Sequence, residues 1–172
     1  MSAFSRRTSK IRSGFSIVSL FSGAGGFDLG MIQAGHRIVW ANDHDPDSVA
    51  TYKLNIGDHI TAGDIETIPS SVIPECDVII GGFPCQGFSN ANLLRFEEDT
   101  RNRLYLEFLR IVSDKQPIAF LAENVGGILS LAGGRAIRRI ETDFRRAGYR
   151  VVTRLFDMAD FGVPQRRRRV II

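Results

Sequence analysis

Residues 21–30 read FSGAGGFDLG and follow an apolar, β-branched run at residues 15–21. A glycine-rich turn between a strand and a helix exposes backbone N–H groups at the carboxyl edge of a sheet, where open α/β folds bind their ligands. The stretch therefore predicts an α/β fold that binds a nucleotide-type ligand at this edge.

The rest of the chain alternates short β-branched runs with segments of helical period, which is typical of a doubly wound, mostly parallel sheet. We expect strands at residues 15–21, 37–41, 60–62, 77–80, 118–121, 151–156 and 170–172. Asp45 before Pro46 predicts the start of a helix that runs to about residue 55. Two more helices are indicated by apolar stripes, at Leu104, Phe108 and Ile111 and at Ile137, Ile140, Phe144 and Ala147, with Gly148 ending the second.

Length and composition indicate one domain. The 172 residues are 44% apolar with only two cysteines, which excludes collagen-like, disordered and disulfide-stapled classes. The chain has no apolar run of the roughly 20 residues that cross a bilayer. Residues 1–14 are basic and Ser-rich without the apolar stretch of a secretory signal. We therefore expect a flexible tail at 1–14, a domain at 15–172, no membrane partner and a cytoplasmic location.

The net charge of +3 conceals an uneven distribution of charge. Residues 16–94 carry two basic and nine acidic side chains, whereas residues 95–172 carry sixteen basic and ten acidic ones. Of the 22 basic residues 19 are arginine, which favours bidentate recognition of phosphate or carboxylate. One interpretation of this uneven charge is that the two halves of the chain bind different ligands. The other is that the arginines form a solvated surface.

The spacing of the glycine loop argues against a phosphate-bearing ligand. A dinucleotide fingerprint needs a small residue at position 28, but Asp28 would repel a pyrophosphate, and no P-loop is present. Asp43, after the second strand, suits ribose hydroxyls, and Asp64, after the third, suits an adenine amino group. Ribose and adenine without phosphate indicate S-adenosylmethionine, the alternative being a tight turn with surface acids.

Three further segments carry reactive side chains. Residues 81–89, GGFPCQGFS, present Cys85 on a shaped loop, whereas Cys76 is expected to be buried and inert. Glu123 follows an apolar run, where partial burial would raise its pKa and let it donate a proton. In QRRRR, residues 165–169, Arg167 and Arg169 share one face of a strand, although such a run is commonly a solvated patch. A Cys-His hydrolase using His44 or His59 is a further alternative.

The segments FSGAGGFDLG, AND, GDI, GGFPCQGFS, ENV and QRRRR, in that order, resemble the DNA cytosine C5-methyltransferases over residues 16–172. The resemblance implies the Rossmann-like fold of S-adenosylmethionine-dependent methyltransferases and no metal. It implies that Cys85 is the nucleophile, Glu123 the acid, and Arg167 and Arg169 the arginines at the cytosine. The implied cofactor contacts are Phe21, Gly23, Gly25, Gly26, Asp43, Asp64, Ile65 and Pro84. The implied substrate contacts are Gln86, Ser89, Asn124 and Gln165, with Arg95, Arg101 and Arg103 as candidates for the DNA backbone.

The resemblance also implies a reaction and a partner. The reaction is methyl transfer from S-adenosylmethionine to C5 of cytosine in double-stranded DNA, by addition of a thiolate to C6 of a flipped base. Gln86 favours the DNA-directed members over the tRNA-directed branch, and a bacterial protein would lie at the nucleoid. Family members more often have Glu where Asp43 stands.

The family continues past the equivalent of residue 172 into a target-recognition region and a segment that returns to the cofactor pocket. We therefore expect the domain at 15–172 to be truncated, and a complete version to be a monomer. The alternative function is a noncatalytic fragment that binds cofactor or DNA, or that needs a partner chain carrying the recognition region.

Overall fold

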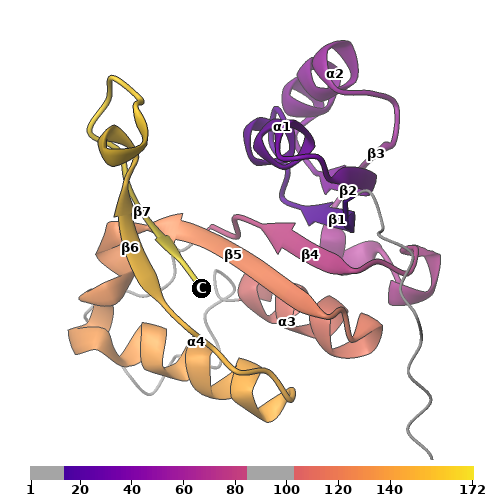
Figure 1. The fold of residues 1–172 in the computed structure, drawn as a ribbon. Helices are drawn as coiled ribbons and strands as arrows, with labels where there is room; N and C mark the ends of the chain where they lie inside the picture. The colour runs from indigo at the N-terminus through magenta and orange to yellow at the C-terminus, as the bar shows by residue number, and fades with distance from the viewer. Residues whose placement is uncertain (1–13, 85–102) are drawn as a thin grey trace, which may run out of the picture.

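A computed structural model describes residues 14–84 and 103–172. Their strands form one seven-stranded sheet with the order β3-β2-β1-β4-β5-β7-β6 (Figure 1). The strands are β1 (Ser16–Leu20), β2 (Arg37–Asp43), β3 (Ile60–Ala62), β4 (Val78–Gly81), β5 (Ala119–Val125), β6 (Arg154–Asp157) and β7 (Arg168–Ile171). Strands β1 to β5 pair in parallel, and β7 is antiparallel to both β5 and β6. The predicted mostly parallel α/β sheet is confirmed.

In the described part of the chain four α-helices cover the two faces of the sheet, α1 (Gly26–Gln33), α2 (Pro46–Asn55), α3 (Arg103–Lys115) and α4 (Arg135–Arg146). Helices α1 and α2 pack with one hydrophobic core around β1, β2 and β4, and α3 and α4 pack with a second core on the opposite face. In Figure 1, α1 and α2 accordingly lie apart from α3 and α4. Short 3₁₀ helices link the strands at η1 (Ile65–Thr67), η2 (Ser70–Val72), η5 (Gly126–Leu129), η6 (Leu131–Gly134) and η7 (Met158–Phe161).

The predicted helix signals hold. The Asp45 carboxylate accepts a hydrogen bond from the Ser48 N–H at 2.9 Å, and α2 begins at Pro46 and ends at Asn55. The apolar stripes of α3 and α4 lie in the core, with Leu104 and Ala147 only half-buried. Gly148 has a φ of +99° just after α4, a left-handed conformation that stops a helix at little cost for glycine.

Some strand boundaries differ from the expectation. Strand β5 was expected to end at residue 121, before Glu123, but it continues to Val125. The cause is the antiparallel pairing with β7, in which Glu123 lies opposite Ile171 and Val125 opposite Arg169. Similarly, β2 extends to Asp43 because Asp43 pairs with Ala62 of β3. Strand β6 begins at Arg154 instead of residue 151, and β7 begins two residues earlier than expected, at Arg168.

Among the residues described, no helix is both long and apolar enough to cross a membrane.

Candidate active site

The glycine loop leaves β1 through left-handed backbone. Phe21 has a φ of +54°, which is uncommon for a residue with a side chain, and Gly23 and Gly25 also have positive φ. A Cβ on Gly25 would lie 2.5 Å from Cδ1 of Ile56, so this position has no room for a side chain. The loop is therefore pressed against α2 and opens toward the carboxyl edge of the sheet.

Asp43 anchors this loop. One of its carboxylate oxygens accepts a hydrogen bond from the Gly23 N–H at 2.7 Å, and the other accepts from the Asp45 N–H at 3.0 Å. Asp43 is buried, and hydrogen bonds from N–H groups to a carboxylate are stronger than those between neutral groups. The side chain that was predicted to bind ribose thus also fixes the shape of the loop, a role that the sequence did not reveal.

A first pocket of about 470 Å³ lies at the ends of β1, β2, β3 and β4. It brings together five of the predicted cofactor residues, Phe21, Asp43, Asp64, Ile65 and Pro84. The remaining lining residues are Asn42, His44, Gly63, Glu66, Gly82 and Leu104. The lining combines aromatic and aliphatic surface with carboxylates and holds no Lys or Arg, so it suits an adenosine and offers a phosphate no counter-charge.

A second pocket, of about 560 Å³, adjoins the first and shares Phe21 and Gly82 with it. Glu123, Arg167 and Arg169 all line this second pocket. Its other lining residues are Ser19, Leu20, Ser22, Gly26, Phe27, Asp28, Gly81, Met158 and Ile171. The predicted acid and the two predicted arginines are therefore together, next to the predicted cofactor pocket.

Glu123 and Arg169 form an ion pair in the second pocket. The Arg169 Nε lies 2.7 Å from Glu123 Oε1, and the two side chains are only 22% and 29% exposed. A Cβ on Gly82 would lie 3.1 Å from Glu123 Oε2, so a glycine at position 82 leaves the carboxylate its space. Arg168 points away and lies 3.8 Å from Asp157, as the predicted alternation of the arginine run requires.

Asn124 is buried and lies outside both pockets. Its amide donates to the Phe83 carbonyl at 2.9 Å and accepts from the Val125 N–H at 2.9 Å. The structure thus places Asn124 as an anchor for the segment that leads to Pro84, instead of at a surface that a substrate reaches. Gln165 is exposed and lies outside both pockets, as do Gly23 and Gly25 of the loop.

Several predicted residues lie outside the described part of the chain. They are Cys85, Gln86, Ser89, Arg95 and Arg101, and for Arg103 only its place at the start of α3 is described. Pro84, the residue before Cys85, lines the first pocket.

His44 and Met158 line the pockets, although neither is among the predicted cofactor or substrate contacts, and His44 was considered only as the base of a hydrolase. His44 directly follows Asp43, and its ring Nδ1 lies 3.6 Å from that carboxylate, so a position next to a strand-end acid was a usable signal. Met158 lies in η7, which follows β6, and no sequence pattern links it to the glycine loop.

Asp28 is fully buried beneath the loop. It accepts hydrogen bonds from the Ser19 hydroxyl at 2.8 Å and from the Tyr52 hydroxyl at 2.9 Å, and the Tyr52 hydroxyl lies 3.1 Å from His59 Nε2. Burial raises the pKa of the Asp28 carboxyl above its ordinary value. His59 is therefore part of a structural hydrogen-bond chain and lines neither pocket.

Cys76 is partly buried, and burial raises the pKa of its thiol to about 11. A thiol in this state is a poor nucleophile, as predicted.

Comparisons with known proteins extend these observations. The family described as C-5 cytosine-specific DNA methylase matches residues 15–172. The chain is 49% identical over 158 residues to the Type II methyltransferase M.NgoFVII of Neisseria gonorrhoeae, covering 91% of this chain and 42% of that protein. It is 46% identical over 154 residues to the Type II methyltransferase M.FnuDI of Fusobacterium nucleatum, covering 90% and 45%. The chain thus spans less than half the length of these relatives.

Among solved structures, a DNA modification methyltransferase encoded within a prophage of E. coli superposes with a TM-score of 0.77 at 32% identity, covering 92% of this chain and 45% of that one. The Dnmt2 methyltransferase of S. pombe, at 24% identity and a TM-score of 0.74, shares the fold over 91% of this chain and 49% of that one. With the family match over almost its whole length, the chain belongs to the C-5 cytosine-specific DNA methylases.

Proposed function

We propose that this chain forms the catalytic and cofactor-binding part of an enzyme that transfers a methyl group from S-adenosylmethionine to C5 of cytosine in double-stranded DNA. The observation that carries the proposal is the pairing of Glu123 with Arg169 in a pocket that opens beside the cofactor pocket. An acid held beside a cofactor site, with Pro84 leading to Cys85, suits covalent catalysis on a pyrimidine ring.

The first pocket fits the adenosine part of S-adenosylmethionine. Asp43 and Asp64 offer carboxylate oxygens to hydroxyl and amino groups, and Phe21, Ile65 and Pro84 offer apolar surface to the adenine ring. Asp64 is held in place because its carboxylate accepts from the Glu66 N–H at 3.0 Å. When bound, S-adenosylmethionine supplies an electrophilic methyl group.

The chain's own residues make the cytosine reactive. The thiolate of Cys85 adds to C6 while the Glu123 carboxyl, protonated on the oxygen that does not face Arg169, donates a hydrogen bond or this proton to N3, which gives C5 the character of an enamine carbon. Arg169 holds the Glu123 carboxyl in the pocket through their ion pair. C5 takes the methyl group and S-adenosylhomocysteine leaves. Water then accepts the C5 proton, N3 returns the proton it received to Glu123, and elimination of the Cys85 thiolate from C6 restores the aromatic ring.

The substrate must be a base outside the double helix, because stacking hides C6 in a duplex. A flipped nucleotide strains the DNA backbone, so cationic contacts to its phosphates are needed, and Arg95, Arg101 and Arg103 are the candidates for them. Arg167, which lines the second pocket beside Glu123, is assigned to the cytosine itself.

The test is nucleoside analysis of plasmid DNA after incubation with the chain and S-adenosylmethionine, at equal concentrations of wild type and Glu123→Gln. We expect a low yield of 5-methylcytosine from the wild type, because the chain spans less than half of its relatives. The yield from the variant should be lower still, because Gln cannot donate a proton to N3. Methylation at an exocyclic nitrogen, or equal yields from both proteins, would contradict the proposal.

The same short coverage favours one alternative, a fragment that binds the cofactor but catalyses only with a partner chain. Calorimetric binding of S-adenosylmethionine without any 5-methylcytosine would indicate that alternative.

A further inference from the structure

Arg110, in the middle of α3, lies against the turn η1 at the first pocket. Its Nη2 donates to the carbonyls of Ile65, at 3.3 Å, and Ile68, at 3.0 Å. Its Nη1 donates to the Ser70 hydroxyl at 2.6 Å, and its Nε donates to the Glu107 carboxylate at 2.6 Å. The Arg110 guanidinium thus joins α3 to η1 and to the segment that follows η1.

The turn that Arg110 contacts carries part of the lining of the first pocket, namely Asp64, Ile65 and Glu66. Asp64 caps η1, and its carboxylate is the group that we assign to the adenine amino group. The turn has only three residues, and so short a helical segment is not stable without contacts from outside it. The direction of the Asp64 carboxylate therefore depends on what holds η1 in place.

Arg110 supplies such contacts at the carboxyl end of the turn. The last carbonyl groups of a helical segment have no partner within it, and a cation near them is favourable. The Ile65 carbonyl accepts from the Ile68 N–H at 3.2 Å, a long hydrogen bond, and Arg110 adds a charged donor to it. Arginine suits this place because its planar fork of N–H groups reaches several acceptors at once, whereas lysine is a single point charge.

The contact is also well supported from the side of α3. The Arg110 side chain is 31% exposed, so water competes only in part for its hydrogen bonds. The Ser70 hydroxyl, which accepts from Arg110, donates to Asp114 of the same helix at 2.6 Å. Leu104, in the first turn of α3, lines the first pocket directly. Helix α3 therefore shapes this pocket twice, through Leu104 and through Arg110.

We propose that Arg110 is a positioning residue for the cofactor. By binding the carbonyls of Ile65 and Ile68, it holds η1 so that the Asp64 carboxylate faces the adenine amino group. Arg110 is not among the residues that line the first pocket, so it acts through Asp64. This role rests on the proposed function, because it requires S-adenosylmethionine in that pocket.

Hydrogen exchange in the ligand-free chain tests whether Arg110 holds η1. The amides of Glu66, Thr67 and Ile68 all donate within the turn, to Asp64 or Ile65. We expect Arg110→Gln to speed their exchange roughly tenfold, because the turn opens more often without its charged donor. Ser70→Ala, which removes only one acceptor of the guanidinium, should speed it about twofold.

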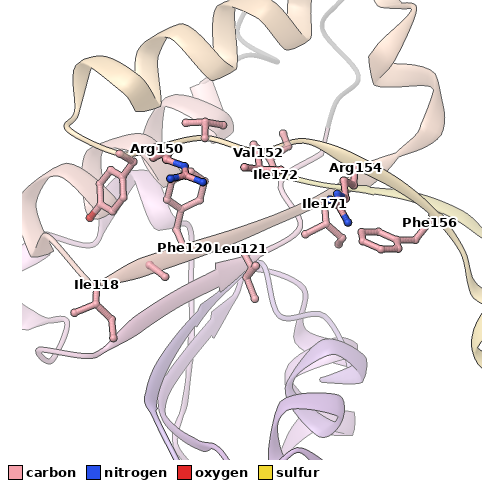
Figure 2. Close-up of a pocket in the computed structure, with 12 residues that line it drawn as sticks. Ile118, Phe120, Leu121, Arg150, Val152, Arg154, Phe156, Ile171 and Ile172 are labelled. Atoms are coloured by element: carbon pink, nitrogen blue, oxygen red, sulfur yellow. The ribbon is translucent and has the colours of Figure 1, made fainter.

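Arg150→Gln is the matched control, because it removes the same charge at an exposed position. Figure 2 shows Arg150 at a separate pocket of about 430 Å³, which shares no lining residue with the first pocket. This variant should leave both the exchange of residues 66–68 and the affinity for cofactor-like ligands as in wild type.

Calorimetry with two ligands tests the role toward the adenine. The ligands are S-adenosylhomocysteine and its analogue that carries hydrogen in place of the 6-amino group. We expect Arg110→Gln to weaken binding of the first roughly tenfold and of the second no more than about twofold. The difference arises because only the first ligand has the amino group that Asp64 accepts from. A merely structural role for Arg110 would weaken both equally.

Unchanged exchange at residues 66–68 in Arg110→Gln, or equal weakening of the two ligands, would overturn the inference. If Arg110→Gln does not fold, Ser70→Ala decides by the same two measurements, with smaller changes of the same pattern expected. A wild-type chain that binds neither ligand would instead contradict the proposed function, and with it the role toward adenine. The exchange measurement is independent of ligand, so the two failures are distinguishable.

Discussion

The ion pair of Glu123 and Arg169 is the most informative contact at the scale of single residues. Both side chains are largely shielded from water, and loss of one partner in such a setting leaves the other charge poorly compensated. The neighbouring Arg168 has the same chemistry, but its side chain is 72% exposed and its Nε lies 3.8 Å from Asp157, a longer contact than that of Arg169. Substitution of Arg168 is therefore a matched control for substitution of Arg169.

Arg169→Gln is expected to lower the initial rate of DNA methylation roughly 100-fold, because the Glu123 carboxyl loses the group that holds it. Arg168→Gln should leave the rate within about twofold of wild type, as for an exposed ion pair. The rates are measured as transfer of a labelled methyl group to DNA. Similar losses in the two variants would show that the Glu123–Arg169 contact has no special role.

Asp43→Asn tests the anchor of the glycine loop. An asparagine keeps the size of the side chain, but it has one acceptor oxygen where Asp43 uses two, so it cannot accept from both the Gly23 N–H and the Asp45 N–H. We expect the dissociation constant for S-adenosylmethionine to rise roughly tenfold, measured by calorimetry. Asp47→Asn, at an exposed position in the first turn of α2, is the control and should bind as wild type does.

Cys76 provides a pH-dependent prediction. Since burial raises the pKa of its thiol to about 11, the unreactive thiol form persists in the folded protein at pH 8. In a Cys85→Ser background, iodoacetamide should modify native Cys76 roughly 100-fold more slowly than the urea-unfolded chain, and the native rate should rise toward pH 11. Mass spectrometry of the tryptic peptide measures both rates, and equal rates at pH 8 would refute the assignment.

Sequence reasoning worked well for residues whose chemistry is unusual for their place. Carboxylates at the ends of strands, Asp43 and Asp64, do line one pocket, and the arginine run does alternate. The sequence could not reveal that Asp43 accepts a hydrogen bond from the Gly23 N–H, or that the Asn124 amide bonds to the Phe83 carbonyl. Both hydrogen bonds join segments that lie far apart in the chain. Met158 was missed for the same reason.

At the scale of elements, the Asp45 cap of α2 has a measurable electrostatic signature. The Ser48 hydroxyl at 2.6 Å, and then the Ser48 N–H, lower the pKa of the Asp45 carboxyl. A lowered folded-state pKa adds stability above the ordinary value of about 3.9, and this stability is lost as the pH falls through the folded-state value.

Asp45→Ala should therefore melt at a lower temperature than wild type at pH 7, and the difference should shrink as the pH falls below about 4. Thermal melts followed by circular dichroism at several pH values measure this difference. A difference in melting temperature that stays constant down to pH 3 would show that the charge of Asp45 does not contribute to the cap.

The elements themselves were largely predictable, and their ends were less so. The helix at Pro46–Asn55 has a local start signal, so its bounds agree with the prediction. The end of β5 has no local signal, because Glu123 and Val125 are strand residues only through their pairing with β7. Placing Glu123 in a strand fixes its direction more firmly than a loop would.

At the scale of the whole molecule, different strands of the sheet form the two pockets. The parallel strands β1 to β4 place the acid-lined pocket at their carboxyl ends, as open α/β sheets do. The antiparallel strand β7 brings Arg169 back across the sheet to Glu123. The two pockets meet at Phe21 and Gly82, which suits a reaction between a cofactor and a second ligand.

The most direct test of this account is trapping of the covalent intermediate. The chain is incubated with S-adenosylmethionine and a long duplex carrying 5-fluorocytosine at every cytosine, so that the target sequence need not be known. Fluorine at C5 blocks the final proton loss, so even a slow enzyme accumulates a protein–DNA adduct that mass spectrometry detects. We predict an adduct for wild type and none for Cys85→Ser, whereas an adduct with Cys85→Ser would contradict the assignment of Cys85 as the nucleophile.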